Sequence, residues 1–337
     1  MNLPSAADPD RSRSPRRIVV VGSYATGLTM KVDRIPGAGE TLLGRGYRVD
    51  FGGKGSNQAV GCARLGTQVA FVARIGSDPF GDMALDLHRQ EGIDTTFVQR
   101  STDAPTGVGF IIVEEESGQN SIVLDPGANE RLSPEDVALA MPIAKSASIL
   151  LTQLEIPVAA AQAALALGRS AHAITILNPA PVRRLPASVL SLIDVLTPNE
   201  TEARVLAGRD PKVAAKPESV AADLLGSGVQ QVIVTLGEKG ALLFSASTEK
   251  HFPAIAVRIK DSTGAGDAFN AGLAVALAHG ESIEDAAQFG IVTGAMSVTK
   301  DGVIPSLPRV QELIEFCALH GIAAPSWLNT KLSPPNA

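Results

Sequence analysis

The chain has 337 residues, of which 45% are hydrophobic and 19% are charged, an ordinary globular composition with ample length for a full core. The formal net charge of −6 gives no basic excess of the kind that predicts nucleic-acid binding. No apolar run reaches the ~18 residues that a membrane-spanning helix needs.

Residues 1–16 are rich in Pro, Ser, Asp and Arg and lack the apolar segment of a secretory signal. We expect a disordered tail there, although its arginines could contact an anionic partner. Residues 323–337 are expected to form a second tail, which leaves one predicted domain over residues 17–322. The two cysteines, Cys62 and Cys317, lie far apart without a CxxC pattern. We therefore expect no disulfide framework and a cytoplasmic location.

Apolar, β-branched runs alternate with helical patterns along most of the chain. The predicted strands are Ile18–Val21, Val69–Ile75, Ile149–Leu154, Ile174–Leu177, Val195–Thr197 and Val232–Leu236. The predicted helices are Asn57–Arg64, Met83–Glu91, Val158–Leu167, Val220–Leu225, Ala265–Ala278, Ile283–Val298 and Leu307–Leu319. This alternation predicts an α/β fold with a mostly parallel sheet and helices on both faces.

Two segments break the alternation. Leu28–Phe51 is punctuated by glycines, and Thr106–Leu124 has the pattern of a β-hairpin. We expect residues 28–49 and 106–124 to form a small separate sheet, which acts either as a lid or as an edge meander with no special task. Such a sheet leaves an edge or a face free to pair, so we expect a homodimer through the lid.

The strongest chemical signal is the sequence DSTGAGD at Asp261–Asp267, which opens an apolar helix. Glycines at a helix start leave backbone N–H groups free, and the helix dipole favours an anion there. Asp267 would lie beside that anion site. A carboxylate next to phosphate-binding amides suits phosphoryl transfer to an alcohol, since it can accept the hydroxyl proton. The alternative is an ordinary helix cap with glycine turns.

A second glycine-rich segment, FGGKGSNQ at Phe51–Gln58, opens another helix. It is not a Walker A loop, because Gly55 follows Lys54 and Arg48 stands where the first glycine should be. Bare glycine backbone with Lys54 and Asn57 could hold a polyhydroxyl substrate. A flexible turn into a helix remains the alternative.

Two further segments follow predicted strands. Asn199 and Glu202 lie three residues apart at the start of a helix, where they could act on Mg²⁺ through water or form an N-terminal capping box. Thr235–Gly240 is a strand that ends in a glycine turn, which could seat a nucleotide or form a simple hairpin. The five histidines are scattered and form no metal-spaced set.

Taken in order, these motifs resemble the ribokinase-like (PfkB) sugar kinase family over about Arg17–Leu319. FGGKGSNQA at 51–59 is similar to the family's substrate signature, DSTGAGDAF at 261–269 to its catalytic signature, and TPNETEA at 197–203 to its N-x-x-E motif. LTQLE at 151–155 and NPAP at 178–181 are closest to the ribokinases within the family. The resemblance implies a Rossmann-like core with a small β-sheet lid.

The resemblance also implies an activity, namely ATP-dependent phosphorylation of a hydroxymethyl group of a sugar, with ribose to ribose 5-phosphate as the leading expectation. A kinase for another sugar or a nucleoside and a non-catalytic sugar-binding regulator are the alternatives. The expected cofactors are Mg²⁺ and potassium, with ATP and the sugar as small-molecule partners.

The same resemblance assigns residues to roles. The catalytic set is the base Asp267 with the anion hole Gly264, Ala265 and Gly266, and the substrate set is Gly53, Lys54, Gly55, Asn57, Glu155 and Asp267. ATP is expected at Asn199, Thr235, Gly237, Gly240 and Gly266, with Glu202 acting on Mg²⁺ through water. Potassium is expected at Asp261, Thr263, Ser297, Lys300, Gly302 and Ser306, partly through backbone oxygens.

One departure from the family pattern concerns the sugar. Ribokinases place an Asn and an Asp after the first strand, in a pattern like G-S-x-N-x-D, where the Asp holds sugar hydroxyls. Here Ala25 and Gly27 stand at those places. The catalytic half of the pattern is complete, but part of the expected sugar contact is missing.

Overall fold

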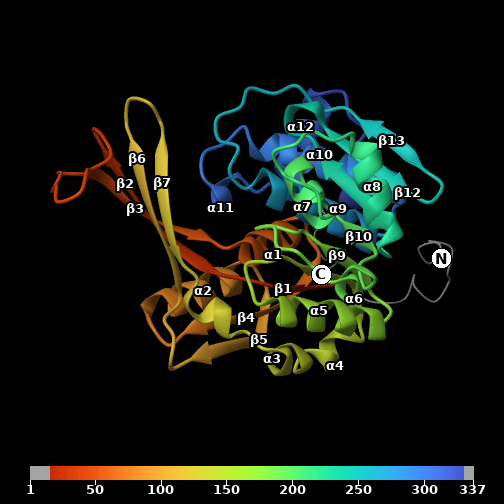
Figure 1. The fold of residues 1–337 in the computed structure, drawn as a ribbon, viewed down its shortest axis with the longest axis horizontal. Coiled ribbons are helices and arrows are strands. Elements are labelled where there is room, and N and C mark those ends of the chain that lie inside the picture. The colour runs from red at the N-terminus through yellow and green to blue at the C-terminus, as the bar shows by residue number, and fades with distance from the viewer. Residues whose placement is uncertain (1–15, 330–337) are drawn as a thin grey trace, which may run out of the picture.

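The computed structural model describes residues 16–329. Its centre is a nine-stranded sheet, ordered β13-β12-β11-β10-β9-β8-β1-β4-β5 (Figure 1). The strands are β1 (Arg17–Val21), β4 (Gln68–Gly76), β5 (Asp94–Ser101), β8 (Ala147–Thr152), β9 (Ile174–Leu177), β10 (Val195–Leu196), β11 (Gln231–Thr235), β12 (Ala241–Ser245) and β13 (Glu249–Phe252). All neighbours from β5 to β11 pair in parallel, and β12 and β13 add an antiparallel hairpin.

Helices cover both faces of this sheet, as predicted, because the central strands send alternate side chains into two cores. Ile18 and Val20 of β1 enter one core, and Val19 and Val21 enter the other. The first core includes α1 (Lys54–Arg64), α2 (Pro79–Gln90), α9 (Ala265–Ala278), α10 (Ile283–Ser297), α11 (Val303–Ser306), α12 (Val310–Leu319) and α13 (Ser326–Asn329). The second includes α3 (Pro134–Ala138), α4 (Met141–Ala144), α5 (Val158–Ser170), α6 (Ala187–Leu190), α7 (Glu200–Leu206) and α8 (Pro217–Gly226).

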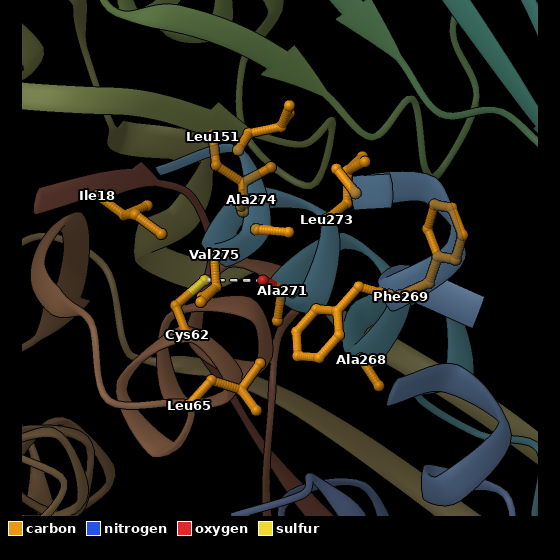
Figure 2. Close-up of a cluster of buried hydrophobic side chains, with 14 of the residues drawn as sticks. Ile18, Cys62, Leu65, Leu151, Ala268, Phe269, Ala271, Leu273, Ala274 and Val275 are labelled. Carbon is orange, nitrogen blue, oxygen red and sulfur yellow. Dashed lines mark hydrogen bonds between the residues drawn. The ribbon is translucent and has the colours of Figure 1, made fainter. Parts of the chain in front are cut away.

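Two small residues bring α1 and α9 close together, which matters for the site. A Cβ built on Gly61 of α1 would lie 2.7 Å from the Cβ of Ala271 of α9, so only glycine permits this approach. The neighbouring Cys62 points at the Ala271 carbonyl oxygen, with an Sγ–O distance of 3.8 Å (Figure 2). The side chains near the start of α1 can therefore reach the first turn of α9.

The segments outside the αβ alternation form a separate sheet of four strands, ordered β3-β2-β6-β7, which projects from the body (Figure 1). The strands are β2 (Ala25–Val32), β3 (Arg45–Gly52), β6 (Gly107–Glu114) and β7 (Asn120–Asp125). This confirms the predicted small sheet, although its strands begin and end a few residues beyond 28–49 and 106–124.

The small sheet has two chemically different faces, because side chains alternate along each strand. One cross-strand row consists of Val49, Leu28, Phe110 and Val123, and the face on which these side chains lie is called the Phe110 face. The next row consists of Asp50, Gly27, Gly109 and Leu124, and the opposite face, on which this row lies, is called the Asp50 face. The Phe110 face is thus apolar along this row, whereas the Asp50 face combines a carboxylate with two glycines.

Strand order fixes where a ligand can bind. From β1 the chain continues to β4 and β5 on one side, and later to β8, β9 and β10 on the other. In open α/β sheets, ligands bind at the carboxyl ends of the strands where the order reverses in this way. The ends of β1 and β8 therefore mark the predicted crevice.

Several elements differ from the sequence-based expectation. The edge strand β5 and the hairpin β12–β13 were not predicted, and α12 begins at Val310 rather than Leu307 because Pro308 disfavours helix at the residue before it. Residues 323–329, assigned above to a tail, include α13, whose Trp327 and Leu328 are buried in the first core. Residues 1–15 and 330–337 lie outside the described part.

Within the described residues, no helix is long and apolar enough to cross a bilayer. The two cysteines, Cys62 and Cys317, are free and buried, in agreement with the expectation that they form no disulfide.

Candidate active site

The ends of β1 and β8 are joined by a hydrogen bond at the predicted crevice. The Ser23 hydroxyl, two residues after β1, donates to Glu155 Oε2 over 2.6 Å. The backbone N–H of Lys54, the first residue of α1, donates to the same oxygen over 2.8 Å. Glu155 thus ties three segments together, and the structure places two predicted substrate residues, Lys54 and Glu155, in contact. Ser23 was not among the predicted site residues.

The two glycines that flank Lys54 allow α1 to start against the β1–β2 turn. Gly53 has φ of 87°, and a Cβ there would lie 2.6 Å from the Cα of Tyr24. A Cβ at Gly55 would lie 2.5 Å from the backbone nitrogen of Ser23. Both positions therefore require glycine, so the FGGKG segment is a rigid backbone junction rather than a flexible turn.

Asp267 lies in the first turn of α9, directly across from α1. Gly264 is the N-cap, with φ of 82°, so the first N–H groups of α9 lie at the positive end of the helix, where that of Ala265 donates to the Ser262 carbonyl oxygen over 3.3 Å. Asn57 Nδ2 donates to Asp267 Oδ2 over 2.8 Å, and Gln58 Nε2 donates to Oδ1 over 2.9 Å. The predicted base, anion hole and substrate residue Asn57 therefore lie in one place.

The environment of Asp267 makes it a stronger base than an ordinary aspartate. Burial raises the pKa of the Asp267 carboxyl, because desolvation penalises the charged form, and Glu155 adds to the rise. The Lys54 ammonium and the bonds from Asn57 and Gln58 act in the opposite direction without cancelling the rise. A carboxylate with a raised pKa accepts a proton more readily near neutral pH.

A buried set of amides supports Asp267, and sequence reasoning assigned no role to it. Gln58 Nε2 also lies 3.0 Å from Asn178 Oδ1, and Gln153 Nε2 donates to Gln58 Oε1 over 2.6 Å. Gln58 and Asn178 stood inside motifs quoted above, yet only the contact itself reveals their part. These bonds fix the orientation of Gln58 and, through it, of Asp267.

Asn199 and Glu202 form a reciprocal capping box at the start of α7, so the capping alternative is confirmed. Asn199 Oδ1 accepts from the Glu202 N–H over 2.8 Å, and Glu202 Oε2 accepts from the Asn199 N–H over 2.9 Å. Burial nevertheless raises the pKa of Glu202, while the Asn199 bond and the charge of Lys54 oppose the rise. A carboxylate held in this way suits a nearby cation.

The residues present fit a water-held Mg²⁺ better than a protein cage. Within residues 16–329 no group of three or more His, Cys, Asp and Glu side chains is arranged to hold a metal. Mg²⁺ usually keeps several waters and binds through one or two carboxylates plus substrate phosphates. Glu202 is the carboxylate that would contact such an ion through water, next to the charge of Lys54.

A cavity of about 550 Å³ opens beside the start of α9. It is lined by four of the predicted ATP residues, namely Thr235, Gly237, Gly240 and Gly266. Asn199 does not line it, but forms a backbone bridge to Thr235. The rest of the wall is mostly apolar and includes Ile255, Val257, Ile259, Phe269, Ile291 and Val298. Ile255, Val257 and Ile259 gave no sequence signal, because the segment before α9 has no regular structure, whereas Phe269, Ile291 and Val298 belong to two helices that the sequence predicted.

The residues predicted for potassium come together in two groups. Asp261 Oδ1 accepts from the Thr263 N–H over 2.9 Å, and Oδ2 accepts from the Gly302 N–H over 3.0 Å. Burial raises the pKa of Asp261, but these bonds and the Arg48 charge outweigh it and keep it low. Ser297, Lys300 and Ser306 lie in the adjoining segment, to which the Asp261 N–H bonds through the Val298 carbonyl. The side chains of Asp261, Ser297 and Ser306 and the backbone carbonyls offer oxygen atoms as ligands, and oxygen ligands suit a hard cation.

Comparison with known proteins gives a consistent result. Residues 15–310 match the family described as pfkB family carbohydrate kinase. The ribokinase of Haemophilus influenzae is 40% identical over 304 residues, covering 89% of this chain and 98% of that protein. The deoxyribokinase of Salmonella typhi is 34% identical over 304 residues, covering 90% and 99%.

A solved structure of Arabidopsis thaliana ribokinase complexed with ribose and ATP has a TM-score of 0.82 to this chain. It is 31% identical, and the likeness covers 90% of this chain and 98% of that one. Both the sequence match and the fold extend over nearly the whole described domain. The chain therefore belongs to the pfkB family of carbohydrate kinases.

Proposed function

We propose that this enzyme transfers the γ-phosphoryl group of ATP to the hydroxymethyl group of ribose, giving ribose 5-phosphate and ADP. The observation that carries the proposal is the buried Asp267, held by Asn57 and Gln58 at the start of α9, beside a cavity large enough for a nucleotide. The similarity to ribokinases, one of them solved with ribose and ATP, supports the choice of sugar.

In the proposed reaction, the sugar hydroxyl oxygen forms a bond to the γ-phosphorus, and the bond from that phosphorus to the β,γ-bridging oxygen breaks. The hydroxyl proton passes to the Asp267 carboxylate. The N–H groups of Gly264, Ala265 and Gly266 hold the charge of the transferred group at the positive end of α9. Lys54, whose charge acts on both Asp267 and Glu202, would lie between the sugar and the phosphates. Mg²⁺, when bound, would neutralise phosphate charge.

The test is a panel of sugars and nucleosides in which ADP formation is measured with ATP and Mg²⁺. We expect ribose to be phosphorylated with kcat/KM of ~10⁴ M⁻¹s⁻¹ or more, within the usual enzyme range. 2-Deoxyribose is the most informative competitor, since a deoxyribokinase is among the relatives. A clear preference for another sugar or a nucleoside would replace ribose but keep the reaction. No ADP formed with any acceptor would favour the sugar-binding regulator.

We propose a monovalent cation, with potassium as the expected ion, between the Asp261 loop and the segment 297–306. The ion would order the anion hole without touching the sugar, so it should act mainly on kcat. Rates are expected to be higher in potassium chloride than in tetramethylammonium chloride at equal ionic strength, and Asp261→Asn should lose this difference. Equal rates in the two salts would contradict the proposal.

We also propose that the small sheet closes over the sugar as a lid and that its Phe110 face pairs two copies of the chain. On this face Met30, Phe110 and Val123 are 39%, 54% and 69% exposed. Such an apolar surface is a normal site for a twofold interface. Phe110→Asp should shift the protein from dimer to monomer in sedimentation equilibrium. Leu139→Asp, at an exposed apolar residue outside the sheet, should leave the mass unchanged. A monomeric wild type would refute the pairing.

Two free, buried cysteines are consistent with the cytoplasmic location that we propose.

A further inference from the structure

The Asp50 face of the small sheet combines residues that β-strands normally avoid. Asp50 pairs directly with Gly27, which in turn pairs with Gly109 on the next strand. Asp and Gly are both depleted in strands, and glycine within a strand often marks a place where a ligand approaches closely. Gly27 leaves a hollow beside the Asp50 carboxylate, whereas the Leu124 side chain covers Gly109, with its Cδ2 2.9 Å from a Cβ built there.

The hollow has room for a ligand group. A Cβ built on Gly27 would be no closer than 3.5 Å to any neighbour, the nearest being Ile111 Cδ1, followed by the Asp50 Cβ at 3.6 Å. The floor is therefore bare backbone, bounded by an aliphatic side chain and a carboxylate. Such a surface suits a sugar, which presents C–H groups and hydroxyls on different sides.

The Asp50 carboxylate is held in place and keeps one oxygen for a ligand. Thr29 Oγ1 and Arg48 Nε donate to Asp50 Oδ2 over 3.2 and 2.8 Å. Within the described residues, Oδ1 has no protein hydrogen-bond donor, and the side chain is 37% exposed. An exposed pair with Arg48 contributes little stability by itself. The arrangement therefore fixes the direction of Asp50 more than it stabilises the sheet.

The Asp50 face is turned toward the loop at residues 261–264, which leads into α9. Arg48 lies on the Asp50 face, since it pairs with Thr29 two residues along from the Asp50–Gly27 pair. The Gly302 N–H donates to Asp261 Oδ2 over 3.0 Å, at the start of the loop that leads into α9 and Asp267. In addition, β3 lies against α11, the short helix that follows Gly302. Asp50 also directly precedes Phe51, where the FGGKG junction of the substrate site begins.

We infer that Asp50 accepts a hydrogen bond from a sugar hydroxyl and so sets the affinity for a polyhydroxylated sugar. This inference rests on the proposed function. The family pattern described above has its sugar-binding Asp at the position of Gly27, and Asp50 is the cross-strand partner of that position. The carboxylate is thus present on the same face of the sheet, carried by the neighbouring strand. Its role is in binding, whereas Asp267 carries the chemistry.

Asp50→Ala should raise the KM for ribose about 10- to 150-fold, the effect of losing a hydrogen bond to a charged group, with kcat changed little. The matched control is Glu115→Ala. Glu115 directly follows β6 and pairs with Arg45, which lies at the end of β3 far from Asp50. This control should leave both constants within about twofold of wild type.

A second variant separates sugar binding from a structural role. Gly27→Asp combined with Asp50→Ala returns a carboxylate to the same face, at a position where a side chain meets only ordinary contacts. The double variant should recover most of the lost ribose affinity. A purely structural Asp50, which acts through Thr29 and Arg48, would not be rescued from position 27.

The outcomes distinguish this inference from the proposed function. A wild type that phosphorylates no sugar overturns the proposed function. A wild type that phosphorylates ribose, together with an Asp50→Ala KM within twofold of it, overturns the inference alone. An equal rise of KM in Glu115→Ala, or failure of the double variant to improve on Asp50→Ala, would also overturn it.

Discussion

Asp267→Asn is expected to lower kcat by at least ~10²-fold, the lower range for a positioned general base, with ATP affinity nearly unchanged. The amide cannot accept the hydroxyl proton, and its NH₂ group would face the donor groups of Asn57 or Gln58. Initial rates of ADP formation at saturating sugar and titration calorimetry with ATP measure the two quantities.

The matched control is Asp285→Asn. Asp285 also lies in the first turn of a long helix, α10, where its N–H is bonded to the N-cap Ser282, but it is remote from the cavity. It should retain wild-type kcat. An Asp267→Asn enzyme that keeps most of its kcat would remove Asp267 from the catalytic role and leave it as a structural helix residue.

The pH dependence of activity is an independent test of Asp267 as the general base. Burial raises the pKa of Asp267, and the base must be deprotonated to work. Activity is therefore full above this raised pKa and is lost as the pH falls through it. The acid limb of kcat/KM should lie at higher pH than the ~3.9 of an ordinary aspartate. A limb at or below that value would contradict the role of burial.

Gly53→Ala is expected to destabilise the fold by roughly 2–5 kcal/mol and to abolish most activity. About 1–3 kcal/mol comes from overpacking and about 1–2 kcal/mol from a left-handed backbone conformation. The added methyl would meet the backbone of Ser23, Tyr24 and Ala25 within 2.9 Å, and none of these atoms is a flexible side-chain end. The chain would have to move α1 and Lys54 away from Glu155.

Urea unfolding and kcat/KM measure the two effects, and Gly226→Ala is the control. Gly226 lies in α8, and a Cβ there meets nothing within 4 Å. That substitution should be neutral or stabilising by up to about 1 kcal/mol, because alanine favours a helix. A Gly53→Ala protein with wild-type stability would mean that the junction is free to relax.

The sequence predicted the centre of the fold because its strands are buried on both faces. Strands such as β1 and β9 therefore appear as continuous apolar runs, and β9 was predicted with the bounds Ile174–Leu177. Two of the missed strands, β5 and β13, lack such a buried apolar run. β13, with the sequence EKHF, has a single buried residue, and β5 has only one buried residue at its end. Their pairing comes from neighbouring strands, which a local pattern does not contain.

The residues of the candidate site likewise fall into those that the sequence could predict and those that it could not. Asp267, Asn57 and Lys54 could be predicted because glycines mark the helix starts that carry them. The roles of Gln58 and Gln153 could not, since a buried amide becomes informative only when its partner is known. The importance of Asp50 likewise depends on register, because only the pairing of β2 with β3 places it opposite Gly27.

In the proposed reaction, the amides around Asp267 also determine the fate of the proton that its carboxylate accepts. Within the described residues, the protein donors to its carboxylate are the amides of Asn57 and Gln58, and behind Gln58 come Asn178 and Gln153. An amide neither gains nor loses a proton near neutral pH, so this chain of bonds can orient the carboxylate but cannot conduct its proton inward. The proton must leave by the route through which the sugar entered. If Asp267 is the base, each turnover would therefore end with its deprotonation from the solvent side, at the same opening that releases the product.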